Sequence, residues 1–375
     1  MTKKAISPTS YLPKILVLGI HAPYQRTNTI ESYYQEFMNL VKTNEIENYS
    51  SLFLKLREIS PVYFFTKGKL ADLKKYCDEH EIEEIIISEV LSTQQESNLS
   101  DFLNIPIYDR TRLILEIFEK SAHSASGKLQ VAVAMLEHKK TRLSGKGVGM
   151  SQQSGSIGVR GGFGETAKEK ETRDINNKIL KLKKKLKSLE KARAIQRKTR
   201  LSNKVPQICL IGYTNAGKST ILNTLTQSNV LAQDKLFATL ETTTRELFIN
   251  SKKKGVISDT VGFIQQLPHK LINAFKSTLD ELQYADLLLH VVDISDTNWQ
   301  LHIKVVHSIL DELNVDKDML YIFNKSDKLQ DFEEIDLKEL EIDIQKYNPH
   351  VLINTQSKQA LSPLKLFLHN WNPQK

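Results

Sequence analysis

The motif "GYTNAGKST" (212–220) is the strongest fold signal in this chain. It has the pattern G-x-x-x-x-G-K-S and stands between a strand-like run, "PQICLIG" (206–212), and a helical run, "TILNTLTQ" (220–227). In this context the pattern forms a phosphate-binding loop, because glycine-rich backbone N–H groups and a helix N-terminus both attract anions. We expect Lys218 to reach the β- and γ-phosphates and the Ser219 hydroxyl to ligate Mg²⁺. The loop therefore predicts a mononucleotide-binding α/β domain.

Two further motifs each follow a strand-like run. In "DTVG" (259–262) the aspartate can hold Mg²⁺ through water, and the Gly262 N–H can bond a γ-phosphate and so sense its presence. In "NKSD" (324–327) the Asp327 carboxylate can accept hydrogen bonds from guanine N1–H and from the exocyclic amino group. Adenine has no donor at N1. The three motifs together predict that the ligands are GTP and GDP with Mg²⁺.

One segment, "LFATLETTTR" (236–245), should close over the γ-phosphate, and it contains four threonines. Thr239 lies twenty residues from both Ser219 and Asp259. This spacing favours Thr239 over Thr243 as the residue that completes the magnesium shell.

The predicted site residues fall into three groups. The catalytic groups are Lys218, Thr239 and Gly262, and the metal ligands are Ser219, Thr239 and Asp259. The nucleotide contacts lie in the phosphate loop, two switch segments and two base-binding loops: Gly212, Tyr213, Thr214, Asn215, Ala216, Gly217, Lys218, Ser219, Phe237, Ala238, Thr239, Leu240, Glu241, Asp259, Thr260, Val261, Gly262, Asn324, Lys325, Ser326, Asp327, Asn354, Thr355 and Gln356. The last loop, "NTQSK" (354–358), is assigned only by its position after a strand-like run.

A phenylalanine follows the second switch motif. In many GTP switches this position is a glutamine that orients the attacking water, whereas Phe263 has no hydrogen-bonding side-chain atom. We therefore expect the free protein to hydrolyse GTP slowly and a partner to stimulate it. A group that neutralises transition-state charge from outside is worth about 10³–10⁵-fold in related systems.

Strand-like and helical stretches alternate through residues 1–125 and again through 205–375, which predicts two α/β domains. The strand-like runs of the first domain are 14–20, 62–65, 84–88 and 105–108. Residues 126–204 predict an antiparallel helical hairpin, with one helix over 127–143 and a second from near Glu165. The second helix carries apolar residues in a heptad seam at 175, 179, 182, 186 and 189. The connection between them, 144–165, holds eight of the fifteen glycines and predicts a flexible tip.

Composition excludes several classes of protein. The chain of 375 residues has 40% hydrophobic residues and no apolar run near 18 residues, so a globular protein without a membrane span is expected. Two cysteines, Cys77 and Cys209, make no disulfide framework. The apolar stretch near the N-terminus is too short for a secretory signal. We expect a cytoplasmic protein that is monomeric in solution.

The positive charge is concentrated in one segment. Lys178–Lys204 holds twelve Lys and Arg against one acid, Glu190, and therefore carries +11. Because the whole chain carries +8, the remainder carries −3. A lysine-rich helix is often only a solvated face, but so lopsided a balance favours contact with nucleic acid. The glycine-rich tip lacks a following Lys-Ser/Thr pair, which disfavours a second phosphate loop.

The chain resembles the HflX family of GTPases over roughly residues 60–375. The resemblance rests on "YDRTRLILEIFEKSA" (108–122), "GKLQVAVAMLEHKKTRL" (127–143), "GVRGGFGET" (158–166) and "DTVGFIQQLPHKLINAFKSTL" (259–279), together with the motifs above. It implies an N-terminal α/β domain, a helical hairpin and a GTP-binding domain. It also implies binding to the large ribosomal subunit and its rRNA, with the hairpin tip near the peptidyl-transferase region, and the splitting of stalled ribosomes. A hydrophobic residue in place of the glutamine is usual in this family.

Three functions stay open at this point. The first is a ribosome-associated GTPase that splits or rescues ribosomes. The second is a GTP-dependent rRNA-binding or assembly factor that docks without splitting. The third is a signalling switch that acts on a protein partner. The concentrated positive charge favours the first two over the third.

Overall fold

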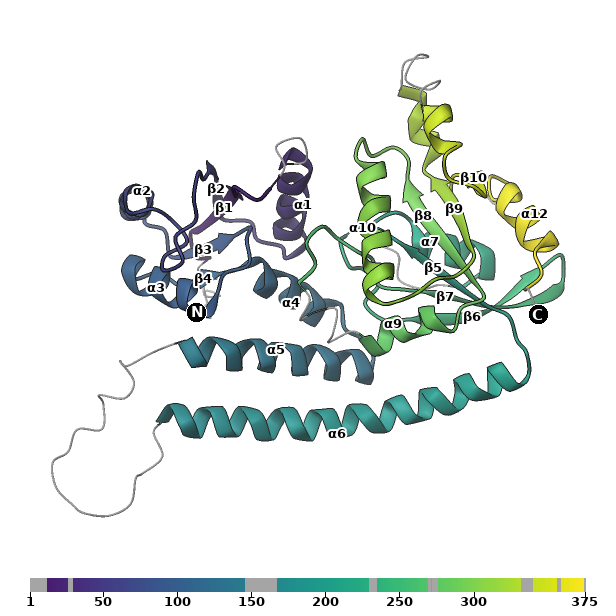
Figure 1. Ribbon diagram of the computed structural model, residues 1–375, viewed down its shortest axis with the longest axis horizontal. Coiled ribbons are helices and arrows are strands. Elements are labelled where there is room, and N and C mark those ends of the chain that lie inside the picture. The colour runs from purple at the N-terminus through teal and green to yellow at the C-terminus, as the bar shows by residue number, and fades with distance from the viewer. Residues whose placement is uncertain are drawn as a thin grey trace, which may run out of the picture. The chain divides into compact units, whose positions relative to one another are not determined.

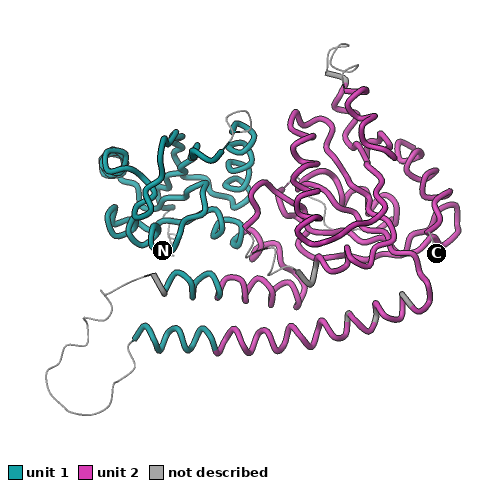
Figure 2. The backbone as a smooth tube through the Cα atoms, in the orientation of Figure 1, with its two compact units in different colours: residues 1–116, 137–176 teal, residues 117–136, 177–375 magenta. Residues whose placement is uncertain are grey.

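The computed structural model describes residues 12–25, 30–145, 167–228, 235–268, 271, 276–331, 340–355 and 359–373. The predicted hairpin tip falls almost wholly outside these ranges. Contacts divide the chain into two compact units (Figure 2), one of residues 1–116 and 137–176 and the other of residues 117–136 and 177–375. Two long helices, α5 (Ala125–Gly145) and α6 (Ala167–Ser202), contribute to both units. The division into three domains at 125 and 204 therefore stays a prediction.

The first unit contains a four-stranded parallel sheet in the order β2-β1-β3-β4. Helices separate the strands along the chain, as the alternation of the sequence predicted. In order the elements are β1 (Ile15–His21), α1 (Ile30–Thr43), β2 (Tyr49–Lys55), α2 (Lys67–Glu79), β3 (Glu84–Ile87), α3 (Thr93–Leu103), β4 (Ile107–Tyr108) and α4 (Arg110–Ser121). Strand β1 is buried along its whole length because it lies inside the sheet.

The prediction of a strand over residues 62–65 is wrong. Residues 62–65 form a turn in which the backbone groups of Ser60 and Phe64 bond each other in both directions, at 3.1 and 2.9 Å. Phe64 has a positive φ of 65° and is buried, so its apolar character reflects core packing and not a strand. The strand lies instead at β2, where exposed and half-buried residues alternate. The apolar run of this edge strand is only three residues long, over 52–54, because one of its faces is largely exposed.

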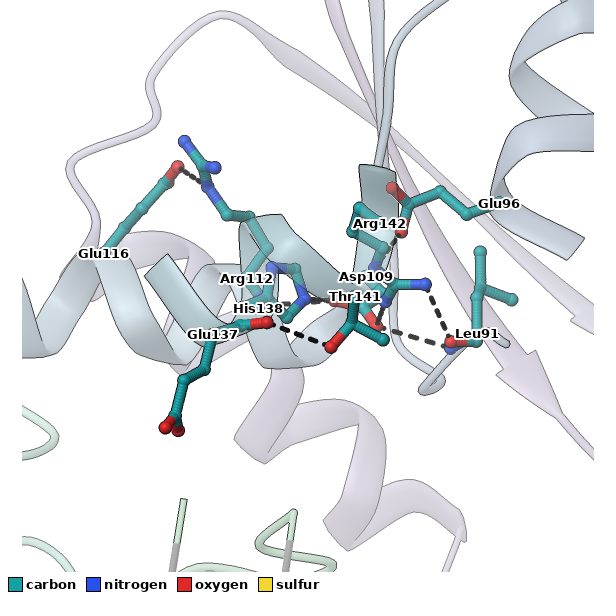
Figure 3. Close-up of polar contacts among 9 residues, drawn as sticks. All are labelled: Leu91, Glu96, Asp109, Arg112, Glu116, Glu137, His138, Thr141 and Arg142. Atoms are coloured by element: carbon teal, nitrogen blue, oxygen red, sulfur yellow. Dashed lines mark hydrogen bonds and ion pairs between the residues drawn. The ribbon is translucent and has the colours of Figure 1, made fainter. Parts of the chain in front are cut away.

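A polar network fixes the end of α5 in the first unit (Figure 3). Asp109, fully buried directly after β4, accepts hydrogen bonds from Arg142 of α5 and from the backbone N–H of Arg112. Arg142 also donates to the Leu91 carbonyl at 3.0 Å and pairs with Glu96 at 2.9 Å. Burial by itself would raise the pKa of Asp109, but the His138 imidazole, the Arg142 guanidinium and the Arg112 N–H together outweigh it and hold that pKa below its ordinary value.

Helices α5 and α6 pack antiparallel, as predicted (Figure 1). Lys139 of α5 pairs with Glu171 of α6 at 2.9 Å, and Leu136 of α5 lines a groove together with Leu182 of α6. Positions of α5 that come earlier in the chain therefore meet later positions of α6. The heptad seam faces this contact, since its first two residues are buried and its last three are half-buried.

The second unit contains a six-stranded sheet in the order β10-β9-β8-β5-β7-β6, in which only the β6–β7 pairing is antiparallel. The strands are β5 (Gln207–Gly212), β6 (Thr243–Ile249), β7 (Lys252–Asp259), β8 (Leu287–Asp293), β9 (Met319–Asn324) and β10 (His350–Leu352). The helices are α7 (Lys218–Thr226), α9 (Lys276–Gln283), α10 (Trp299–Glu312), the 3-10 helix η2 (Ser326–Asp331) and α12 (Ser362–Asn370). The strand-like runs predicted before the phosphate loop and before the motifs that begin at 259, 324 and 354 are confirmed as β5, β7, β9 and β10. Within the described ranges, no helix is both long and apolar enough to cross a membrane.

Candidate nucleotide site

The phosphate loop lies between β5 and α7, at the carboxyl end of the parallel strands. Gly212 has a φ of 145°, and a Cβ there would meet the Val291 carbonyl at 2.2 Å. Gly217 has a φ of 98°, and a Cβ there would meet the Asn324 amide nitrogen at 2.2 Å. Both positions therefore require glycine for the backbone conformation and for the close approach.

Lys218 begins α7 and folds back over the loop. Its ammonium donates to the carbonyls of Gly212 and Tyr213 at 3.2 and 2.7 Å. Burial lowers the pKa of Lys218 to about 8, although the carboxylate of Asp259 acts in the opposite direction. A phosphate would restore a strong anionic partner to this ammonium, which fits the predicted role of Lys218.

Three predicted magnesium ligands converge on one point. The Ser219 hydroxyl lies 2.7 Å from the Thr239 hydroxyl and donates to Asp259 Oδ2 at 2.5 Å. Asp259 is fully buried, and its Oδ1 has no hydrogen-bond partner among the residues described. Burial raises the pKa of Asp259 above its ordinary value, while Lys218 and the two hydroxyls lower it. A cluster of hard oxygen atoms with an unsatisfied buried carboxylate oxygen fits Mg²⁺, which prefers such ligands.

The segment after Asp259 runs directly beside the phosphate loop. A Cβ at Gly262 would meet the Thr214 Cα at 2.7 Å and the Lys218 ammonium at 3.0 Å, so the backbone here comes close to both. Phe263 is 1% exposed, and its side chain packs in a hydrophobic cluster that includes Cys209 of β5. The phenyl ring therefore belongs to the core and is not among the side chains that line the phosphate pocket.

The base-binding motif follows β9. The fully buried Asn324 donates to the Ala216 carbonyl at 2.9 Å and so connects this motif to the phosphate loop. The Lys325 ammonium pairs with Asp293 Oδ2 at 2.6 Å. Sequence analysis missed Asp293, whose only signal is its position as the last residue of a buried strand.

The second predicted base-binding loop lies next to the first. The Ser326 N–H donates to the Ile353 carbonyl at 3.2 Å, which brings Asn354 and Thr355 close to the motif after β9. Asp327, Asn354 and Thr355 are all half-buried. Gln356, the last residue assigned to this loop, lies outside the described residues.

A pocket opens where the phosphate loop meets the switch segment of residues 236–245. Nine of the predicted residues line it: Thr214, Asn215, Gly217, Lys218, Ser219, Phe237, Ala238, Thr239 and Gly262. Thr220 and Lys235 also line the pocket and were not predicted. Lys235 directly precedes the switch segment, and its positive charge was the available signal. The carboxylate of Glu241, which was also predicted as a nucleotide contact, accepts a hydrogen bond from the Ser124 N–H.

The sheet, the phosphate loop and the guanine-type motif define a P-loop GTPase. Three family models match the chain: "GTP-binding GTPase N-terminal" over residues 31–119, "GTP-binding GTPase Middle Region" over 121–200 and "50S ribosome-binding GTPase" over 207–325. The GTPase HflX of Caldanaerobacter subterraneus subsp. tengcongensis is 42% identical over 317 residues, which are 84% of this chain and 73% of that protein. The GTPase HflX of Escherichia coli K12 is 38% identical over 315 residues, which are 84% of this chain and 74% of that protein.

The chain therefore belongs to the HflX family of GTPases, as the resemblance of its motifs indicated. It binds GTP and GDP with Mg²⁺ and hydrolyses GTP. Among solved structures, the SsGBP–GDP complex is 25% identical, covers 95% of this chain and 97% of its own, and has a TM-score of 0.49.

Proposed function

We propose that this GTPase acts on the large ribosomal subunit and that its GTP cycle splits or rescues stalled ribosomes. The observation that carries the proposal is the exposed basic face of α6. Among the lysines after Lys178, the side chains at 181, 183, 184, 185, 187 and 191 are all exposed to solvent. A family model described as a ribosome-binding GTPase also matches residues 207–325. This role would place the protein in the cytoplasm.

The basic face fits RNA better than it fits a protein partner. Closely spaced lysines on one helix can neutralise several neighbouring phosphates, and the release of their counterions drives binding. The groove between α5 and α6 has apolar residues, Leu136 and Leu182, next to Lys178, Lys181 and Lys185. Lysine stems can cover such apolar surface while their ammonium groups reach outward to phosphates.

In the nucleotide site, we assign each predicted residue a separate task. Lys218 holds the β- and γ-phosphates, and the Gly262 N–H bonds the γ-phosphate when it is present. Ser219, Thr239 and Asp259 hold Mg²⁺, which neutralises negative charge on the phosphate oxygens. Asp327 and Asn324 select guanine and secure its loop. The convergence of the three oxygen ligands and the buried position of Lys218 support the tasks assigned to these four residues.

Hydrolysis by the free protein should be slow, because position 263 contributes no polar side chain and its ring is packed in the core. The attacking water then lacks an orienting side chain at this place. The ribosome would supply the group that fixes the water or neutralises charge, so that hydrolysis follows docking and gives the cycle its direction.

Sedimentation of 70S ribosomes on sucrose gradients tests the proposal. The protein is added with GTP, with a non-hydrolysable GTP analogue or with GDP, and the 70S peak and the two subunit peaks are measured. Conversion of 70S into subunits with the analogue supports splitting. Co-migration with one subunit and an unchanged 70S peak supports instead an rRNA-binding assembly factor. Absence of the protein from every ribosomal peak supports a switch that acts on a protein partner.

A further inference from the structure

The switch segment of residues 236–245 contacts the first turn of the hairpin helix α5. Glu241 Oε1 accepts a hydrogen bond from the Ser124 N–H at 2.9 Å, and Ser124 directly precedes α5. The Ser124 hydroxyl in turn accepts from the Gly127 N–H at 3.0 Å, and the Ser124 carbonyl accepts from the Lys128 N–H at 3.0 Å. Ser124 is therefore the N-cap residue of α5. Its backbone N–H has no acceptor within the helix, and Glu241 supplies one.

This arrangement has the hydrogen bonds of a capping box whose acid comes from another part of the chain. In a capping box, a Glu or Gln three residues after the N-cap reaches back to the N-cap N–H. Here that position is Gly127, which has no side chain. A Cβ at Gly127 would meet Glu241 Oε1 at 2.0 Å and Glu241 Cδ at 2.7 Å, so the carboxylate occupies the space that a side chain at 127 would take. The partial positive charge at the start of α5 also favours a carboxylate here.

A second contact restrains the chain on the N-terminal side of Thr239. Phe237 packs edge to face on Phe118 of α4, with ring centroids 4.7 Å apart and planes at 85°. Phe237 is 2% exposed and has a positive φ of 56°, which a non-glycine residue adopts only when its surroundings hold it there. Thr239 thus lies between two anchored neighbours, and its hydroxyl lies 2.7 Å from that of Ser219.

We infer that Glu241 is a positioning residue that uses the N-terminus of α5 to hold Thr239 at the magnesium site. The inference rests on the proposed role of Thr239 as a magnesium ligand. Because coupling between two sites is reciprocal, Mg²⁺ with a GTP analogue should in turn protect the first turn of α5. The nucleotide state is then transmitted to the hairpin through one carboxylate.

The test measures the apparent Mg²⁺ affinity of the complex with a fluorescent, non-hydrolysable GTP analogue. Removing a charge-assisted hydrogen bond that restrains a ligand should weaken this affinity in Glu241→Ala roughly 5- to 50-fold. Glu241→Gln keeps an acceptor without the charge, and its affinity should lie between those of the parent and Glu241→Ala. Gly127→Ala should also weaken Mg²⁺ binding, because its methyl group displaces the carboxylate.

A double variant separates positioning from simple helix stability. Glu241→Ala with Gly127→Gln restores a local capping box, so the thermal midpoint should return towards the parent value while Mg²⁺ affinity stays low. Hydrogen exchange gives a readout independent of metal affinity: the analogue with Mg²⁺ should slow exchange at residues 125–128 in the parent and not in Glu241→Ala.

Thr239→Ala is the control for the metal assignment. If Thr239→Ala weakens Mg²⁺ binding and Glu241→Ala does not, the inference is wrong and the metal assignment stands. If Thr239→Ala leaves Mg²⁺ affinity unchanged, the assignment of Thr239 fails and the inference fails with it. Recovery of both the Mg²⁺ affinity and the thermal midpoint in the double variant would also overturn the inference. Glu241 would then act only by capping α5.

Discussion

Thr214 of the phosphate loop donates its backbone N–H to the carbonyl of Phe263 at 2.8 Å. The Phe263 N–H donates in turn to the Gly212 carbonyl at 3.2 Å. These bonds join the phosphate loop to the segment that carries Gly262. They also direct the phenyl ring of Phe263 into the core beside β5. Phe263, which replaces the usual glutamine, therefore contributes to the site through its backbone groups and not through its side chain.

This relationship predicts different outcomes for two substitutions of Phe263. Phe263→Ala leaves a cavity in the core and should cost about 3–5 kcal/mol of unfolding free energy. Phe263→Leu keeps most of the packing and should cost less. Per folded molecule, Phe263→Leu should hydrolyse GTP at the parent's basal rate, because the ring donates no polar group. Urea unfolding and single-turnover hydrolysis measure the two effects, and a more than tenfold lower basal rate in Phe263→Leu would contradict this account.

The preference of the site for guanine over other bases should depend on Asp327. Asp327→Asn replaces an acceptor by a donor that faces guanine's own donors, and such a mismatch costs about 1–3 kcal/mol, or roughly 5- to 150-fold in GDP affinity. Xanthine has an oxygen at C2, so affinity for xanthosine diphosphate should rise. Competition with fluorescent GDP measures both affinities. Unchanged GDP affinity would mean that Asp327 does not contact the base.

Nucleotide binding should depend on pH through Lys218. Burial depresses the pKa of Lys218 to about 8, below its usual 10.5, so the free protein loses this proton as pH rises past about 8. Bound phosphates favour the charged ammonium and raise its pKa, so GDP binding near pH 9 should take up a proton. GDP affinity should consequently fall as pH rises from 8 to 10.

Calorimetry in two buffers of different ionisation enthalpy measures that proton uptake at pH 9. Below pH 7 the ammonium is charged with or without nucleotide, and uptake by Lys218 should vanish. Equal uptake at pH 6.5 and pH 9 would assign the proton to another group.

The lysines of α6 should govern the salt dependence of ribosome binding. Changing Lys181, Lys184, Lys185 and Lys187 to Gln should reduce the slope of log affinity against log salt by about one unit for each phosphate that a lysine no longer neutralises. The matched control changes four exposed lysines elsewhere, namely Lys67, Lys69, Lys304 and Lys317. If both variants show the parent's slope, the basic face of α6 does not contact RNA.

The buried ion pair in Figure 3 should contribute strongly to stability. Arg142→Met removes the cation beside the fully buried Asp109 and should cost about 3–5 kcal/mol. Lys139→Gln on the same helix removes a pair whose lysine side chain is 58% exposed, and it should cost at most about 1 kcal/mol. Urea unfolding compares the two variants, and similar losses would refute the special role of the buried pair.

Asp109 should also affect the stability of the protein at acid pH. The pKa of Asp109 is lower in the folded protein than in the unfolded chain. The stability that Asp109 provides is therefore complete above about pH 5 and is lost as pH falls through its folded pKa. The parent should lose more stability than Asp109→Asn as the pH is lowered from 5, and equal losses would show that Asp109 is not responsible.

Several parts of this protein are encoded by residues that are neighbours in the sequence, and these parts could be predicted. "GYTNAGKST" between an apolar strand and a helix predicted the phosphate loop, because the glycines and the lysine act within one turn of backbone. The motifs at 259–262 and 324–327 were recognisable for the same reason, since each directly follows a strand. Two helical stretches on either side of a long glycine-rich connection likewise predicted an antiparallel hairpin, and the second stretch carries a heptad seam.

Contacts between residues that are distant in the sequence became visible only in the folded chain. Strand β2 has an apolar run of only three residues, so its pairing with β1 was visible only in the sheet. Glu241 meets Ser124 across 117 positions of sequence, and Lys325 meets Asp293 across 32. The direction of the Phe263 ring depends on the core that surrounds it. A residue's type and spacing express its local conformation, but its partner is set by packing between segments, which no short pattern contains.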